Sequence, residues 1–130
     1  MTPRVGVLAL QGDVREHQRI LTDLGAHAPR VRTPDDLTGV DALVIPGGES
    51  TTIARLALVL DMLEPLTIAV TSGMPTYGSC AGMILLADRL VDAPADQVTI
   101  GGLHVTVRRN AFGRQVNSFE ADLDVAGVSP

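Results

Sequence analysis

The chain has 130 residues, a formal net charge of -5, and 45% apolar against 19% charged residues. This length fits a single domain over residues 1–130, and the apolar excess favours an α/β fold whose central strands are covered on both faces. The negative charge, with only one tyrosine and two phenylalanines, argues against a nucleic-acid partner. The single cysteine excludes an internal disulfide, and the scattered histidines predict no metal site.

The amino-terminal residues show no signal-peptide pattern, and no apolar run approaches the roughly 20 residues that a membrane span needs. We therefore expect a cytoplasmic protein without membrane association.

Apolar runs and their periodicity predict alternating strands and helices in the first part of the chain. A strand buried on both faces is expected at 5–10, followed by a helix at 14–24 that Asp13 caps and Gly25 ends. We expect this helix to turn four apolar side chains toward the core: Val14, Ile20, Leu21 and Leu24. The later segments are predicted as a strand at 28–32, a turn at 33–36, a strand at 40–45, and helices at 50–60 and 63–72.

The second part of the chain continues this alternation before it becomes irregular. The patterns predict a short buried strand at 74–77, a helix from Cys80 to about residue 90, a surface loop at 92–97, one or two antiparallel strands within 98–107, and another strand at 116–123. The βαβ series predicts a mostly parallel central sheet with helices on both faces. Ligands in such sheets bind at the carboxyl ends of the strands.

The only cysteine lies in a Gly-x-Cys-x-Gly pattern between a predicted strand and a predicted helix. Gly78 and Gly82 flank Cys80 at two residues on either side, which is the pattern of a nucleophile elbow. Such a turn leaves the thiol exposed over the amino end of a helix, where a negatively charged thiolate is favoured. The alternative is that Cys80 is a small buried apolar residue.

A second glycine-rich turn, at 46–50, follows another predicted strand. If Cys80 is a nucleophile for acyl transfer, its tetrahedral intermediate needs backbone N–H donors for the oxyanion. The N–H of Ala81 is one candidate, and a glycine N–H from Gly47 or Gly48 is the other. The alternative for the glycine pair is a plain turn into a helix or a phosphate cradle.

Several motifs together resemble one known family. They are Leu-Ala-Leu-Gln-Gly at 8–12, Pro-Gly-Gly-Glu-Ser-Thr-Thr at 46–52, the elbow at 78–82, Arg-Asn-Ala-Phe-Gly-Arg-Gln at 109–115 and Asn-Ser-Phe-Glu at 117–120. This set is similar to the glutaminase subunit of pyridoxal 5'-phosphate synthase, a class I, triad-type glutamine amidotransferase. The resemblance implies a flavodoxin-like class I amidotransferase fold over nearly the whole chain.

The resemblance also implies an activity, a partner and a set of site residues. The activity is hydrolysis of L-glutamine to L-glutamate and ammonia without a cofactor, and the ammonia passes to a separate synthase subunit. Matched motif by motif, Cys80 is the nucleophile, and Gly48 and Ala81 supply the oxyanion N–H groups. The substrate-binding residues are Gly47, Gly48, Glu49, Ser50 and Arg109. The alternative for Arg109 is an ordinary solvated arginine.

Gln11 and Gly12 end the first predicted strand, beside the glycine pair in a parallel sheet. Since family glutaminases depend on docking to the synthase, we expect this loop to couple docking to activation. One departure from the family is clear: its carboxyl-terminal His-Pro-Glu motif, which supplies the base, has no counterpart, because the chain contains no His-x-Glu. We therefore expect a domain truncated at its carboxyl end and weak or inactive alone.

Two other functions stay open at this level. The first is a catalytically silent domain that docks on the synthase. The second is a reactive-thiol hydrolase or stress protein with the same elbow, which would leave the turn at 46–50 and Arg109 unexplained.

Overall fold

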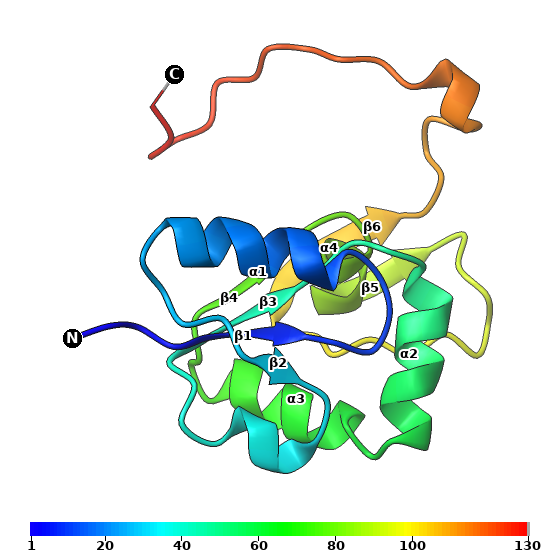
Figure 1. Ribbon diagram of the computed structural model, residues 1–130. Helices are drawn as coiled ribbons and strands as arrows, with labels where there is room; N and C mark the ends of the chain where they lie inside the picture. Colours follow the sequence, from blue (N-terminus) through cyan, green and yellow to red (C-terminus); the bar gives the residue numbers. More distant parts are fainter. Residues whose placement is uncertain (130) are drawn as a thin grey trace.

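A four-stranded parallel sheet forms the centre of the computed structural model, which describes residues 1–129 (Figure 1). The strand order is β2-β1-β3-β4, with bounds Val5–Leu8 for β1, Arg30–Val31 for β2, Ala42–Ile45 for β3 and Thr76–Gly78 for β4. β1 pairs in parallel with both β2 and β3, and β3 pairs with β4. The predicted α/β class and parallel sheet are confirmed, although every strand is shorter than its apolar run.

Helices lie on both sides of this sheet, as predicted. Figure 1 shows α1 along one side and α3 along the other. The helices are α1 (Val14–Asp23), α2 (Ser50–Val59), α3 (Leu63–Thr71) and α4 (Ala81–Leu86), with short 3-10 turns η1 (Pro34–Leu37) and η2 (Gln115–Asn117). The turn predicted at 33–36 is the start of η1.

The two faces of the sheet are packed very differently. The main core joins the sheet to α2, α3 and α4, and its fully buried side chains include Leu8, Ile45, Ile53, Leu66 and Leu85. α1 contributes no buried residue.

The predicted inward face of α1 is therefore wrong in part. Ile20 is 57% exposed and Leu24 is 78% exposed. An apolar groove of about 510 Å³ separates α1 from the β3–β4 side of the sheet, and Ile20, Leu21 and Tyr77 are among the residues that line it.

The helix predicted to run from Cys80 to residue 90 ends early, which is a second correction. α4 stops at Leu86, and β5 (Ala87–Val91) follows directly. The Leu85 carbonyl explains the stop, because it accepts hydrogen bonds from Ile100 N (2.7 Å) and Gly101 N (3.2 Å). A longer helix would use that carbonyl internally.

The segments after the loop at 92–97 differ from prediction in direction and in extent. β6 (Leu103–Arg108) pairs with β5, but the pairing is parallel, not antiparallel. The strand predicted at 116–123 is wrong: η2 and irregular chain occupy that stretch. β4 is also wrongly predicted as buried, because it lies at the end of the sheet order and Tyr77 is 61% exposed.

Candidate active site

The exposed thiol of Cys80 lies at a tight turn between β4 and α4. Cys80 has φ 50, a left-handed conformation that non-glycine residues rarely adopt. The flanking glycines are required by close approach. A Cβ added at Gly78 would lie 2.6 Å from the carbonyl carbon of Gly82, and one added at Gly82 would overlap the carbonyl oxygen of Ile45. This strand-turn-helix geometry has the form of a nucleophile elbow.

The loop after β1 and the glycine turn after β3 are locked together beside the thiol. Asp13 N donates to the Gly47 carbonyl oxygen at 3.1 Å. A Cβ on Gly12, whose φ is 108, would overlap that same oxygen. A Cβ on Gly47 would lie 3.5 Å from the Cβ of Cys80. Three segments far apart in sequence therefore meet at the carboxyl ends of neighbouring strands.

The side chain of Gln11 lies directly on the glycine turn. Its Oε1 accepts a hydrogen bond from Glu49 N at 2.9 Å. A Cβ added at Gly48 would lie 2.5 Å from the same Oε1. Gln11 thus fixes the peptide that follows Gly48, whereas the Asp13 bond fixes the peptide that precedes it. Because peptides are trans and planar, the Gly48 N–H points opposite to the Gly47 carbonyl, away from Asp13.

Glu49 is the amino-terminal cap of α2. Its carboxylate accepts from Thr52 N at 2.7 Å and also from the hydroxyls of Thr51 and Thr52. The Thr51 hydroxyl bond, with the further bonds from Thr52, lowers the pKa of Glu49 below its usual range. The carboxylate is held ionised at the turn beside the thiol.

Arg109, which follows β6, reaches this turn from 60 residues away in sequence. Its side chain is 15% exposed, and its Nη2 lies 3.4 Å from Glu49 Oε1. Its Nη1 donates to Gln97 Oε1 at 3.0 Å, and Gln97 Nε2 donates to the buried hydroxyl of Ser50 at 3.0 Å. Arg109 Nε is buried and has no hydrogen-bond partner among the described residues. The arginine is therefore not an ordinary solvated side chain.

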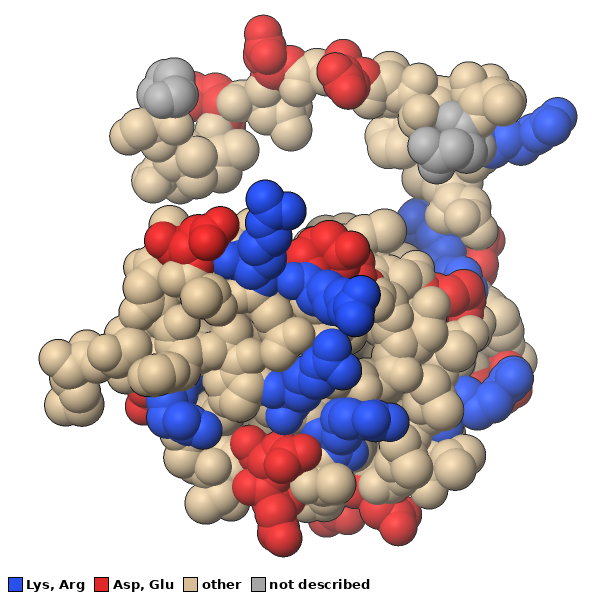
Figure 2. Space-filling model, viewed as in Figure 1, with Lys and Arg blue, Asp and Glu red and all other residues tan. Residues whose placement is uncertain are grey.

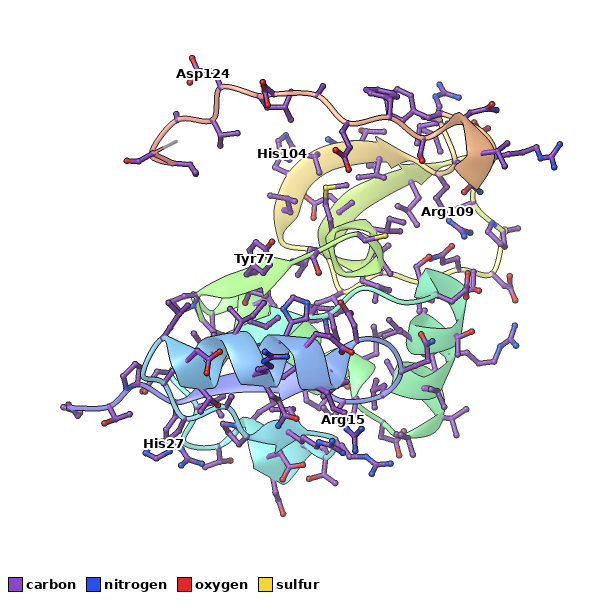
Figure 3. The ribbon with its side chains drawn as sticks, turned by 45° about the horizontal axis from the view of Figure 1, so that its top comes forward. Arg15, His27, Tyr77, His104, Arg109 and Asp124 are labelled. Carbon is purple, nitrogen blue, oxygen red and sulfur yellow. The ribbon has the colours of Figure 1, made fainter. Side chains whose placement is uncertain are left out.

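The structure brings together every site residue that the sequence predicts, but it also adds two. Figure 3 shows the sticks of this region, with Arg109 above α2 and Tyr77 on the opposite side of the elbow. The first addition is Gln97, which the sequence placed in a surface loop. The second is His17 on α1, whose Nε2 lies 3.2 Å from Ser79 Oγ and 3.7 Å from Asp13 Oδ2. Asp13 occupies the predicted cap position of α1 but makes no side-chain cap bond.

The remaining histidines lie elsewhere. His104 on β6 is 3.5 Å from Asp88 with its side chain 87% exposed. His27 joins the edge of the sheet through a backbone bridge with Arg4. Within residues 1–129, no group of histidine, cysteine and carboxylate side chains is arranged to hold a metal ion. No described helix combines the length and apolarity required to cross a bilayer.

Fold and site together define an α/β protein with a thiol on a strand-to-helix elbow and a diglycine turn beside it, the arrangement of an enzyme with a thiol nucleophile. The SNO glutamine amidotransferase family matches residues 7–129. The chain belongs to this family, which confirms the resemblance inferred from the motifs.

Individual relatives agree with this assignment. The chain is 65% identical over 126 residues to the pyridoxal 5'-phosphate synthase subunit PdxT of Frankia alni, covering 97% of this chain and 63% of that protein. It is 61% identical over 128 residues to the subunit of the same name from Mycobacteroides abscessus, covering 98% and 66%. A crystal structure of a glutamine amidotransferase superposes with a TM-score of 0.85 at 50% identity, covering 95% of this chain and 65% of that one. The chain thus spans a little under two thirds of the length of these relatives.

Proposed function

We propose that this chain belongs to a glutaminase that hydrolyses L-glutamine to L-glutamate and ammonia, and that the ammonia serves a pyridoxal 5'-phosphate synthase subunit. The observation that carries the proposal is the convergence of the Cys80 elbow, the 47–50 turn and the guanidinium of Arg109 in one place. The relatives named as subunits of pyridoxal 5'-phosphate synthase support it. They favour it over a silent docking domain and over a thiol hydrolase of another kind.

The proposed chemistry uses a covalent intermediate. The Cys80 thiolate attacks the side-chain amide carbon of glutamine, and the carbonyl oxygen becomes an oxyanion that the N–H groups of Gly48 and Ala81 stabilise. The C–N bond then breaks, ammonia leaves with an added proton, and a thioester remains. Water attacks the thioester and releases glutamate and the thiol. Arg109 holds the α-carboxylate of glutamine through charge-assisted bonds. Together with Gly47, Glu49 and Ser50 it forms the glutamine-binding part of the site, which we call the cradle.

The first experiment measures labelling of Cys80 by a chloroketone analogue of glutamine at neutral pH, with mass spectrometry as the readout. We expect labelling faster than that of a free cysteine, saturation with the analogue, and competition by L-glutamine. Cys80→Ala is the control for labelling at any other residue. Labelling that glutamine does not slow would contradict the proposal.

We further infer that the 130 residues alone turn over glutamine slowly. General acid–base help contributes about 10²–10⁴-fold, and the leaving ammonia needs a proton donor. The 130-residue chain and a version extended by the carboxyl-terminal segment of a relative would be compared in a glutamate-release assay. Turnover by the shorter chain near a common enzymatic rate of about 10 s⁻¹ would contradict the inference.

The synthase partner is proposed to act through Gln11 and Gly12. This loop adjoins a surface rich in arginine: Figure 2 shows blue side chains gathered over the face that carries α1 and β2, and Arg15 and Arg30 border the same hollow as Gln11 and Gly12. Pressure on the loop would alter the Asp13–Gly47 bond and the Gln11–Glu49 bond. Either change reorients a peptide that adjoins Gly48, at little steric cost because the residue is glycine.

This coupling is tested in the carboxyl-extended version with the synthase subunit added. We expect the synthase to raise kcat, and Gln11→Ala to weaken that stimulation more than it weakens docking. Gln18→Ala, which changes a glutamine on α1 away from the glycine turn, is the matched control. Equal glutaminase rates with and without the synthase would refute the coupling.

A further inference from the structure

The side-chain amide of Gln97 connects two parts of the proposed glutamine cradle. Its oxygen accepts from Arg109 Nη1 at 3.0 Å, and its nitrogen donates to Ser50 Oγ at 3.0 Å. Ser50 is 2% exposed and begins α2, while Arg109 follows β6. One amide therefore joins the start of a helix in the main sheet layer to the end of a strand in the two-stranded sheet.

The chemistry of this bridge suits an arginine that must keep its charge for a ligand. An amide oxygen orients a guanidinium without neutralising it, whereas a carboxylate at the same place would cancel the positive charge. Nη1 donates a hydrogen bond to Gln97 Oε1, whereas Nη2 lies at the longer distance of 3.4 Å from Glu49 Oε1. The guanidinium has five N–H donors, so most of its capacity is uncommitted.

The buried Nε of Arg109 has no hydrogen-bond partner among the described residues, which indicates that an acceptor for it is missing. A buried donor without an acceptor costs free energy. Nε–H and the neighbouring Nη2 hydrogen lie on one edge of the guanidinium and match the two oxygens of a carboxylate. A carboxylate that bound along that edge would satisfy the donor, and to reach Nε it would have to displace the atoms that now cover it.

We propose that Gln97 is a positioning residue that holds the Arg109 guanidinium, through its bond to Ser50, in the orientation that receives the α-carboxylate of glutamine. The inference rests on the proposed function and adds to it the residue that orients the carboxylate-binding group. Gln97 acts on substrate affinity and not on the thiol.

The test separates affinity from reactivity in the labelling of Cys80 by the chloroketone analogue of glutamine. The half-saturating concentration of the analogue and the maximal labelling rate are measured for the wild-type chain, Gln97→Met and Gln97→Glu. Gln18→Met is the matched control, because Gln18 also joins an arginine to a second acceptor: its Oε1 accepts from Arg30 Nε at 3.3 Å, and its Nε2 donates to the Ala28 carbonyl at 2.8 Å. Iodoacetamide, which carries no carboxylate, measures the intrinsic reactivity of the thiol in each variant.

We expect Gln97→Met to raise the half-saturating concentration by about tenfold, the size expected for losing a hydrogen bond to a charged group. Its maximal rate and its iodoacetamide rate stay within about twofold of wild type. Gln97→Glu raises the half-saturating concentration at least as much, although a carboxylate can still bond Arg109, because the added negative charge repels the α-carboxylate. Gln18→Met leaves all three quantities within about twofold.

Different results identify which idea fails. If the wild-type chain shows no saturation and no competition by L-glutamine, the proposed function fails, and with it the inference. If wild type saturates but Gln97→Met and Gln97→Glu match Gln18→Met, the inference alone is overturned. If circular dichroism shows that a Gln97 variant has not folded, Gln97→Asn replaces it, because asparagine keeps the amide but shortens its reach. An unchanged half-saturating concentration in folded Gln97→Asn also overturns the inference.

Discussion

The two halves of the candidate site are built by different means. Around the thiol, Gly12, Gly78 and Gly82 allow backbone segments to approach so closely that a single Cβ would overlap a neighbouring backbone atom. In the cradle, the side chains of Gln97 and Arg109 span long gaps through single hydrogen bonds. The geometry of the first half depends on the small volume of glycine. The geometry of the second half depends on the charge of Arg109 and on the direction of its hydrogen bonds.

This difference predicts how each half of the site responds to amino-acid substitutions. Backbone overlap is close to all-or-none, because the atoms in contact cannot rotate away as side chains do. A polar bridge weakens by degrees, since its groups retain other partners or water. Substitutions in the glycine half should therefore affect folding and reactivity together, and those in the cradle should affect affinity alone.

The largest effect is expected for Gly82→Ala. Alanine is the better helix former, so propensity alone predicts that α4 becomes more stable by about 1 kcal/mol. The new Cβ would instead overlap the Ile45 carbonyl, and we expect a loss of about 3 kcal/mol, or about 10 °C in Tm by calorimetry.

Gly25→Ala is the matched control for that substitution. Gly25 has φ 91 but no atom within 4 Å of an added Cβ, so only the backbone conformation opposes alanine, at about 1 kcal/mol. An equal loss of Tm in the two variants would contradict the steric account of the elbow.

The next effect is expected for Arg109→Lys, which keeps the charge but loses the planar fork. We expect the half-saturating concentration of the glutamine analogue to rise about tenfold, with the Tm almost unchanged.

The neighbouring residue offers the control. Arg108 Nη1 pairs with Asp92 Oδ2 at 2.7 Å, and both side chains are about 60% exposed. Exposed pairs contribute little, so Arg108→Lys should alter neither quantity. An effect on the half-saturating concentration at Arg109 no larger than that at Arg108 would remove Arg109 from the proposed cradle.

The same division explains how much could be predicted from the sequence. The glycine half follows from local patterns: Gly-x-Cys-x-Gly after an apolar run predicts the elbow, and parallel topology brings Gln11 and the 46–50 turn beside it. These inferences depend on sterics, which act over a few residues.

The cradle could not be found in this way. Arg109 was identified only through the family resemblance, and Gln97 lies in a stretch whose composition predicts a plain surface loop. Their contact depends on β5 and β6 pairing in parallel, and the periodicity of 87–91 favoured continued helix over strand. His17 likewise showed no signal, because its Ser79 partner lies 62 residues away.

The smallest effect concerns Glu49, which belongs to both halves because it caps α2 and faces Arg109. Its pKa is lowered from the ordinary value of 4.5, chiefly by the Thr51 hydroxyl bond. A lowered pKa means that the ionised Glu49 carboxylate stabilises the folded protein fully at a pH above about 4.5. This stabilisation is lost as the pH falls through the lower pKa of the folded state. Wild type should therefore exceed Glu49→Gln in Tm by a constant, small margin near neutral pH, corresponding to less than about 1 kcal/mol because the side chain is half exposed.

That margin should shrink below pH 4.5 and vanish where the Glu49 carboxyl is protonated in the folded protein. Glu64→Gln, in the first turn of α3, measures what the loss of one acidic side chain at a helix start does by itself. The measurement is Tm by circular dichroism from pH about 7 to pH about 3 for the three proteins, since this range spans the ionisation of ordinary carboxyls. A wild-type margin over Glu49→Gln that stays constant across this range would show that the neutral cap is as good as the ionised one. The Glu49 carboxylate would then act only through its ion pair with Arg109. Its effect would appear in the half-saturating concentration of the glutamine analogue rather than in Tm.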